Sequence, residues 1–143
     1  MKRLTIAIIL SLILCSCATV KPETNLPSQN IYEPTVPGKT RVVFFNGSNK
    51  VLYADGSSLI GIKIDGKGVA NINYNQYVQL DLTPGDYSLE LSHFDAIIFR
   101  DKYNLPIKDE AMFIKVFNRP VSTQFKILPT KPSAFDTEFS PVF

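Results

Sequence analysis

Few side chains in this sequence could act as nucleophiles or general bases. The 143 residues include two cysteines, Cys15 and Cys17, and one histidine, His93. A thiolate is a far better nucleophile than a hydroxyl, and both cysteines follow an apolar run from Leu4 to Leu14. Histidine is a common general base, but no nucleophile motif accompanies His93. The two cysteines are therefore the first candidates for chemistry.

Residues 1–16 have the layout of a secretion signal. Lys2 and Arg3 give a basic start, the apolar run follows, and small residues precede Cys17. The run has roughly half of the about 20 apolar residues that a membrane-spanning helix needs, so we expect export and not a permanent span. The alternative is an ordinary secretory signal with two incidental cysteines.

The residues Leu14-Cys15-Ser16-Cys17 resemble the lipobox of bacterial lipoproteins. The resemblance implies that Cys17 receives a diacylglyceryl group and further acyl chains such as palmitate, and that it becomes the mature N-terminus. The protein would then meet the membrane through the lipid on Cys17. Ala18 stands where inner-membrane lipoproteins tend to carry aspartate, which implies an outer-membrane anchor on the periplasmic side.

Charge and composition argue against several functional classes. Without Lys2 and Arg3, the 15 basic residues fall to 13, which equals the 13 acidic residues. A chain without net charge gives no support for nucleic-acid binding. With one histidine and no free cysteine after lipidation, a zinc site is not expected. The sequence contains no phosphate, dinucleotide or calcium loop, so we expect no cofactor.

Proline and turn residues divide the remainder into three parts. Residues 17–39 contain four prolines and no periodicity, which predicts a lipidated N-terminus and flexible tether with a reach of about 25 to 70 Å. Residues 40–128 alternate between apolar and polar positions and predict an all-β domain, a small antiparallel β-sandwich of about seven short strands. Residues 129–143, interrupted by Pro132 and Pro141, are expected to form an irregular C-terminal tail.

Two turn motifs stand out within the domain. Asp65-Gly66 separates two alternating runs, and both residue types tolerate the positive φ of a tight hairpin. Pro84 and Gly85 predict a second turn, after which Tyr87 begins a strand with its ring inward and its hydroxyl free to bond the turn backbone. We interpret all five residues as structural.

These motifs carry a resemblance over residues 41–128. The stretches that carry it are 41–45, 62–67, 77–82 and Pro84-Gly85-Asp86-Tyr87. They resemble a small domain of unknown function found in many Gram-negative lipoproteins, which is more distantly similar to the PEGA-type surface domain. The resemblance implies a β-sandwich and little about activity. Residues 46–58 and the tail depart from the pattern.

The alternation breaks down between residues 93 and 102. Continuing the register would bury His93 and Asp95 and expose Phe94 and Ile98, so we expect the strand to end or bulge near Ser92. Phe94 and Ile98 are the candidate contact surface. The alternative is a loop that tucks its apolar side chains, from Phe94 to Phe99, under the sandwich.

The expected function is that of a non-enzymatic structural or protein-interaction module of the cell envelope, with an envelope protein or glycan as partner. One alternative is a glycan- or peptide-binding lipoprotein, suggested by the asparagine- and tyrosine-rich residues 71–77. A less favoured alternative is a small hydrolase. It would combine His93 with one carboxylate and one serine from a set that comprises Asp86, Asp95, Ser88 and Ser92.

The lipobox resemblance predicts that Cys17→Ser abolishes acylation and leaves the precursor uncleaved, because the substituted hydroxyl cannot replace the thiolate. Labelling cells with a fatty-acid probe measures this. Cys15→Ser is the matched control and should label normally. Label on Cys17→Ser but not on Cys15→Ser would show that the acylated residue is misassigned.

Overall fold

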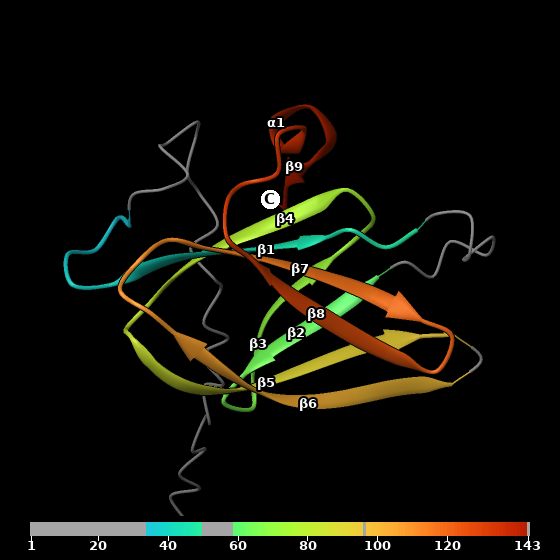
Figure 1. Cartoon of the computed structure of the whole chain (residues 1–143). Helices are drawn as coiled ribbons and strands as arrows, with labels where there is room; N and C mark the ends of the chain where they lie inside the picture. The colour runs from blue at the N-terminus through green and yellow to red at the C-terminus, as the bar shows by residue number, and fades with distance from the viewer. Residues whose placement is uncertain (1–33, 50–58, 96, 143) are drawn as a thin grey trace, which may run out of the picture.

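The computed structural model describes residues 34–49, 59–95 and 97–142, which form two β-sheets packed face to face (Figure 1). The expected all-β sandwich is confirmed. The described residues hold nine strands and one short helix: β1 (Thr40–Asn46), β2 (Ile60–Ile64), β3 (Lys67–Ile72), β4 (Gln76–Leu82), β5 (Gly85–Phe94), β6 (Ile98–Ile107), β7 (Met112–Arg119), β8 (Ser122–Leu128), α1 (Phe135–Glu138) and β9 (Ser140–Pro141).

The two sheets differ in strand direction. One has the order β3-β2-β5-β6 and is antiparallel throughout, whereas the other has the order β8-β7-β1-β4-β9. In this five-stranded sheet β1 runs parallel to β7, and β4 runs parallel to β9. The five-stranded sheet is therefore mixed, because the chain leaves it after β1 and again after β4, and returns to it at β4 and at β7.

The sequence-predicted turns lie where the chain reverses or changes sheets. Asp65 and Gly66 have φ values of 49° and 76° and join β2 to β3 as a two-residue hairpin. Gly85 has a φ of 150°, which favours glycine, directly after the turn at Pro84. The Tyr87 hydroxyl donates a hydrogen bond of 2.8 Å to the Thr83 carbonyl. This bond fastens the start of β5 to the end of β4.

Every residue of β1 is buried. Val42 and Phe44 face the space between the sheets, where they join a large apolar core with residues of seven other strands. Val43 and Phe45 face the opposite side, where Phe113 and Phe135 complete a second, smaller core. A strand that is buried on both faces reads as a continuous apolar run, as β1 does.

Part of the segment expected to be an irregular tail is folded, because α1 and β9 lie within it, whereas residues 129–134 form bends and turns. Phe135 and Phe139 lie one helical turn apart, and their rings lie 5.4 Å and 4.9 Å from that of Phe45. Beyond the helix, Ser140 and Pro141 pair with β4 at the edge of the sheet, where a proline without an N–H is tolerated. The segment folds because the outer face of β1 has to be covered.

The interpretation of residues 93–102 is also wrong. β5 continues without a bulge to Phe94 and pairs in register with β6 from Gly85↔Ile107 to Phe94↔Ile98. His93 is buried and Phe94 is exposed, so the register continues in spite of the cost of this pattern. β8 begins at Ser122, so Val121 lies in the turn before it and is exposed.

We expect Gly85→Val to lower the free energy of unfolding by about 1–3 kcal/mol, because a β-branched side chain is strained at this φ. Tyr87→Ala should cost several kcal/mol, and Tyr87→Phe, which removes only the hydroxyl, about 1 kcal/mol. Gly68→Val is the matched control, since an added Cβ there meets nothing within 4 Å and its φ is ordinary. Urea denaturation measures all four variants, and equal stability of Gly85→Val and Gly68→Val would contradict the strained corner.

Candidate contact surface

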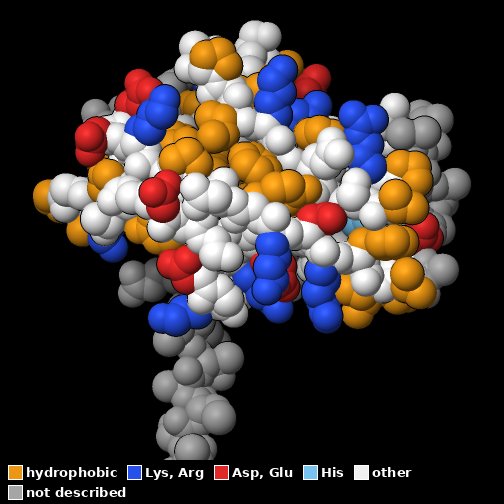
Figure 2. Space-filling model, turned by 60° about the horizontal axis from the view of Figure 1, so that its bottom comes forward, with side chains coloured by type: hydrophobic (Ala, Val, Ile, Leu, Met, Phe, Trp, Pro, Cys, Tyr) orange, Lys and Arg blue, Asp and Glu red, His pale blue; other side chains and the backbone are white. Residues whose placement is uncertain are grey.

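One end of the sandwich exposes large apolar side chains, which Figure 2 shows gathered at its right-hand side. Phe94 and Ile98 close the β5–β6 hairpin and are 61% and 56% exposed, and Ile97 between them is 61% exposed. Leu59 directly precedes Ile60, which pairs with His93, so Leu59 lies beside Phe94. Val121, in the turn before β8, is 73% exposed at the same end. We call these five residues the apolar end.

The alternative in which this region tucks under the sandwich is therefore wrong for Phe94, Ile97 and Ile98. Phe99 does turn inward, and its ring stacks on that of His93 with 5.0 Å between centroids and 16° between planes. Alternate residues of one strand point to opposite faces, so burying His93 and Phe99 leaves Phe94 and Ile98 outside.

A polar cluster beneath the apolar end joins the two sheets. His93 on β5 is 2% exposed, and its Nδ1 lies 2.7 Å from the hydroxyl of the fully buried Thr123 on β8. The His93 Nε2 has no hydrogen-bond partner among the described residues. Burial lowers the pKa of His93, although Asp101 and Asp95 oppose this shift. The folded protein thus favours the neutral imidazole.

Two residues of β6 complete this cluster at the free edge of β8. The Thr123 backbone N–H donates to the Asp101 carboxylate at 2.6 Å, and the Tyr103 hydroxyl donates to the Thr123 carbonyl at 2.6 Å. Burial raises the pKa of Tyr103, and the Asp101 charge adds to this. The backbone N–H and carbonyl of Thr123, on the edge strand β8, thus have hydrogen-bond partners on the other sheet. They are not available to pair with a further strand. The apolar end thus lies next to a set of hydrogen bonds that join the two sheets.

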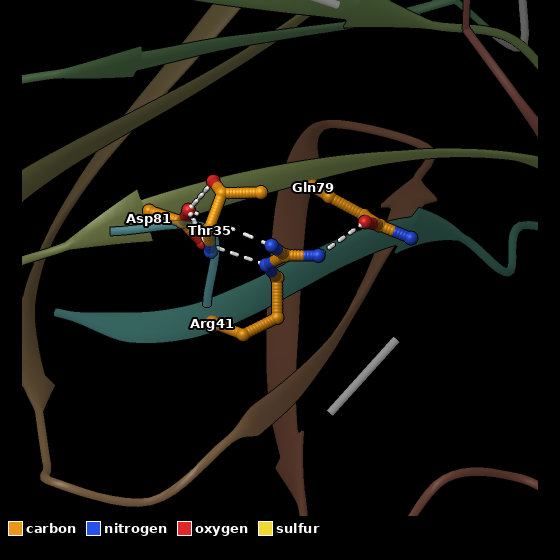
Figure 3. Close-up of polar contacts among 4 residues, drawn as sticks. All are labelled: Thr35, Arg41, Gln79 and Asp81. Carbon is orange, nitrogen blue, oxygen red and sulfur yellow. Dashed lines mark hydrogen bonds and ion pairs between the residues drawn. The ribbon is translucent and has the colours of Figure 1, made fainter. Parts of the chain in front are cut away.

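A second polar network lies near the other end, around the buried Arg41 (Figure 3). The Arg41 Nε donates to Asp81 at 2.6 Å, and its Nη1 donates to Gln79 at 2.6 Å. Thr35 donates to Asp81 through its backbone N–H at 2.7 Å and also through its hydroxyl. Burial raises the pKa of Asp81, but the bonds from Arg41 and Thr35 outweigh it and leave this pKa below its usual value.

This network corrects one expectation. The tether does not extend to residue 39 as a free segment, because Thr35 is already bonded to β4. Asp81, in turn, pairs with a buried guanidinium group. Removing one partner of a buried ion pair leaves the other charge unpaired, so we interpret the network as structural.

The other sequence-predicted site residues that the structure describes lie apart from the apolar end. Cys17 lies outside the described residues. Asp65, Gly66, Pro84, Gly85 and Tyr87 belong to the turns of the opposite end. Ser88 and Ser92 lie on the face of β5 opposite His93, so the structure does not assemble the serine–histidine pair considered above.

Sequence reasoning found Phe94 and Ile98 but missed Leu59, Ile97 and Val121. The one available signal was the apolar pair Ile97-Ile98 beside Asp95, because turn positions are usually polar. Leu59 and Val121 join the surface only through strand pairing, which no local pattern reveals. The bond between Thr123 and a histidine 30 positions earlier was not predicted either, because no local pattern links the two residues.

The part of the chain that the structure describes contains no group of three His, Cys, Asp or Glu side chains placed to hold a metal ion. No helix in that part is long and apolar enough to cross a membrane. Comparisons with models of protein families, with curated proteins and with solved structures found no match. The resemblance of residues 41–128 to a lipoprotein domain therefore stays a prediction.

The burial of His93 predicts a loss of stability in mild acid. Its pKa is lowered by folding, so the unfolded chain binds a proton more readily as the pH falls below about 6.5. The contribution of His93 to the free energy of unfolding is complete above about pH 6.5 and is lost as the pH falls through the lower pKa of His93 in the folded state. The melting temperature should fall more steeply from pH about 8 to about 5 in the wild type than in His93→Gln. Parallel curves would show that His93 does not titrate differently on unfolding.

Proposed function

We propose that this chain is a lipid-anchored cell-envelope protein whose β-sandwich is a non-enzymatic module that contacts another envelope component through the apolar end. The observation that carries the contact is the exposure of Phe94, Ile97 and Ile98 on one hairpin beside Leu59 and Val121. Isolated exposed apolar residues are common, but a contiguous group of large ones usually marks an interaction site. The lipobox resemblance at Cys17 supports the anchor, and Ala18 supports the periplasmic side of the outer membrane.

The positions of the two ends support this division of roles. The described chain enters beside Thr35 and Thr40, at the end of the sandwich where β4 finishes and β5 begins. The apolar end lies at the far end of β5, roughly 30 Å away for a strand of this length. An anchor at one end leaves the other accessible to a partner.

The alternative of glycan or peptide binding has less support. It rests on the polar residues 71–77, and three of these are engaged in hydrogen bonds. The Gln76 side chain accepts a hydrogen bond of 2.9 Å from the Asn73 N–H, and the Asn75 N–H donates to the Asn46 carbonyl. Residues 73–75 connect β3 to β4, and these bonds to β4 and β1 hold the connection in place.

If the apolar end is a contact surface, Phe94→Asp and Ile98→Asp should each change the free energy of unfolding by no more than about 0.5 kcal/mol, as exposed substitutions do. Leu91→Asp, on the buried face of the same strand, is the contrasting control and should cost several kcal/mol. A melting scan distinguishes them. Strong destabilisation by Phe94→Asp would mean that this side chain supports the fold.

The function itself is tested by placing a photo-crosslinking amino acid at position 94 in cells that export the lipidated protein. Irradiation should give a defined adduct with protein, glycan or lipid. The same amino acid at position 88 is the matched control, since Ser88 is exposed on the same face of β5 toward the other end. Equal adducts at both positions, or none at position 94, would contradict a specific contact surface.

A further inference from the structure

We propose that the apolar end and the cationic outer face of the β2–β5–β6 sheet beside it dock onto a phospholipid bilayer that carries anionic headgroups. This inference rests on the contact surface of the proposed function and names its occupant, but it does not require acylation of Cys17. Three observations carry it: the row of protruding apolar side chains, the cations behind that row, and the small area of the apolar end.

The strand pairing places apolar and cationic side chains in successive rows on one face. Leu59, Phe94 and Ile98 form the outermost row, as the pairs Ile60↔His93 and Phe94↔Ile98 require. The next row contains Gly61, Ser92 and the exposed Arg100. The row behind it contains Lys63, Glu90 and Lys102. Figure 2 shows Lys and Arg side chains beside the apolar group on this face.

The charges of this face favour an anionic partner. Glu90 is flanked by Lys63 at 3.1 Å and by Lys102 at 3.7 Å, and its contact with Lys63 lowers the pKa of Glu90. Within these two rows one carboxylate therefore stands among three cations, of which the Lys102 side chain is 74% exposed. Asp86, four residues before Glu90, and Asp95 at the hairpin tip lie outside the two rows. Gly61 has no side chain, so the row that it shares with Ser92 and Arg100 protrudes less at this position. An added Cβ would lie 2.6 Å from the Ser92 hydroxyl. Apolar side chains at the tip with cations behind them match the acyl boundary and headgroup layers of a membrane interface.

The shape and size of the apolar end favour a bilayer over a second protein. Its side chains protrude from turns and strand ends, with Val121 73% exposed. Five side chains of this kind present roughly 500 Å², whereas a protein interface of standard size buries about 800 Å² on each partner. A bilayer needs no matching pocket, because a few protruding apolar side chains can enter its interface.

An anchor at the other end of the sandwich is compatible with this docking. Because Thr35 is already bonded to β4, the predicted tether comprises residues 17–34 and spans up to about 60 Å when extended, and the sandwich is roughly 30 Å long. A domain held near a bilayer by one attachment meets it at a high effective concentration, so a weak second contact suffices.

The test uses the chain from residue 18 to residue 143, which lacks the apolar signal segment and keeps every contact described above. Vesicles of phosphatidylethanolamine with phosphatidylglycerol are compared with vesicles of phosphatidylcholine alone, by co-sedimentation. We expect binding to the first and much weaker binding to the second. Phe94→Ser with Ile98→Ser should abolish binding, and a melting scan checks that this double variant stays folded. Equal binding to both kinds of vesicle, or no binding, would overturn the inference.

The electrostatic part is tested by a matched pair of double variants. Arg100→Gln with Lys102→Gln should weaken binding about fivefold for each charge removed. Lys115→Gln with Lys126→Gln also removes two cations, from cross-strand partners of β7 and β8 in the other sheet. Ile114 and Val116 face the core, so Lys115 and its partner Lys126 point away from the four-stranded sheet. Packed sheets lie about 10 Å apart, which is the screening length, so binding should not change. An equal loss in both pairs would indicate general charge attraction and would overturn the docking geometry.

Insertion into the bilayer is measured by tryptophan fluorescence, which reports the polarity around the side chain. The chain contains no tryptophan, so a single introduced one gives the whole signal. Phe94→Trp supplies a single fluorophore at the apolar end, and Ser88→Trp supplies one on the same face farther from it. Adding the anionic vesicles should shift the emission of the first variant to the blue and leave the second unchanged. If neither co-sedimentation nor the fluorescence shift shows vesicle binding, but position 94 forms an adduct with a protein in cells, the docking onto a bilayer is overturned and the contact surface of the proposed function is retained. Failure of the crosslinking as well would remove the proposed function.

Discussion

All seven side chains of β1, from Thr40 to Asn46, are buried in the middle of the five-stranded sheet. Its inner face requires the opposing sheet, and its outer face requires α1 and the aromatic cluster around Phe135. The polar members of the strand need partners as well. Arg41 finds Asp81 and Gln79, and the Asn46 side chain donates to the Ile72 carbonyl at 3.1 Å and accepts from the Ser48 N–H at 3.0 Å. The position of the C-terminal segment follows from the burial of this one strand.

At the other end of the molecule, polar groups lie inside and apolar groups outside. His93 and Thr123 are buried, and they link strands of different sheets by a hydrogen bond, while Asp101 and Tyr103 bond the Thr123 backbone. The partners of the His93 Nδ1 and of Thr123 offset much of the cost of burying these groups, although the His93 Nε2 has no partner among the described residues. Nothing comparable compensates the exposure of Phe94 and Ile98 within the described residues. A rigid polar support beneath an uncovered apolar row is the arrangement expected of a surface that has its partner outside the chain.

Neighbouring lysine side chains have different surroundings in the two sheets. In the four-stranded sheet Glu90 stands between Lys63 and Lys102, which holds the three side chains in one row across β2, β5 and β6. In the other sheet Lys115 and Lys126 face each other directly across β7 and β8. Only the first arrangement lies beside the apolar end, so an ordered cationic face and an apolar row are combined at one place. This combination distinguishes the proposed surface from the general charge of the protein.

By itself the sequence determined the features that depend on a few neighbouring residues. The hairpin at Asp65-Gly66, the corner from Pro84 to Tyr87 and the alternation of β2, β4 and β5 follow from local φ preferences and from the period of the strand. These features were enough to predict the all-β sandwich. The lipobox resemblance at Cys17 is equally local, and it stays a prediction.

Only the tertiary structure decided the features that depend on pairing between distant segments. The parallel pair β1–β7, the cover supplied by Phe135 and the bond between Arg41 and Asp81 join residues that no short window contains. The same holds for the apolar end, where Leu59, Phe94 and Ile98 become neighbours through the register of two strand pairs. Register is set by the burial of whole faces across the sandwich, so it emerges only when both sheets are in place.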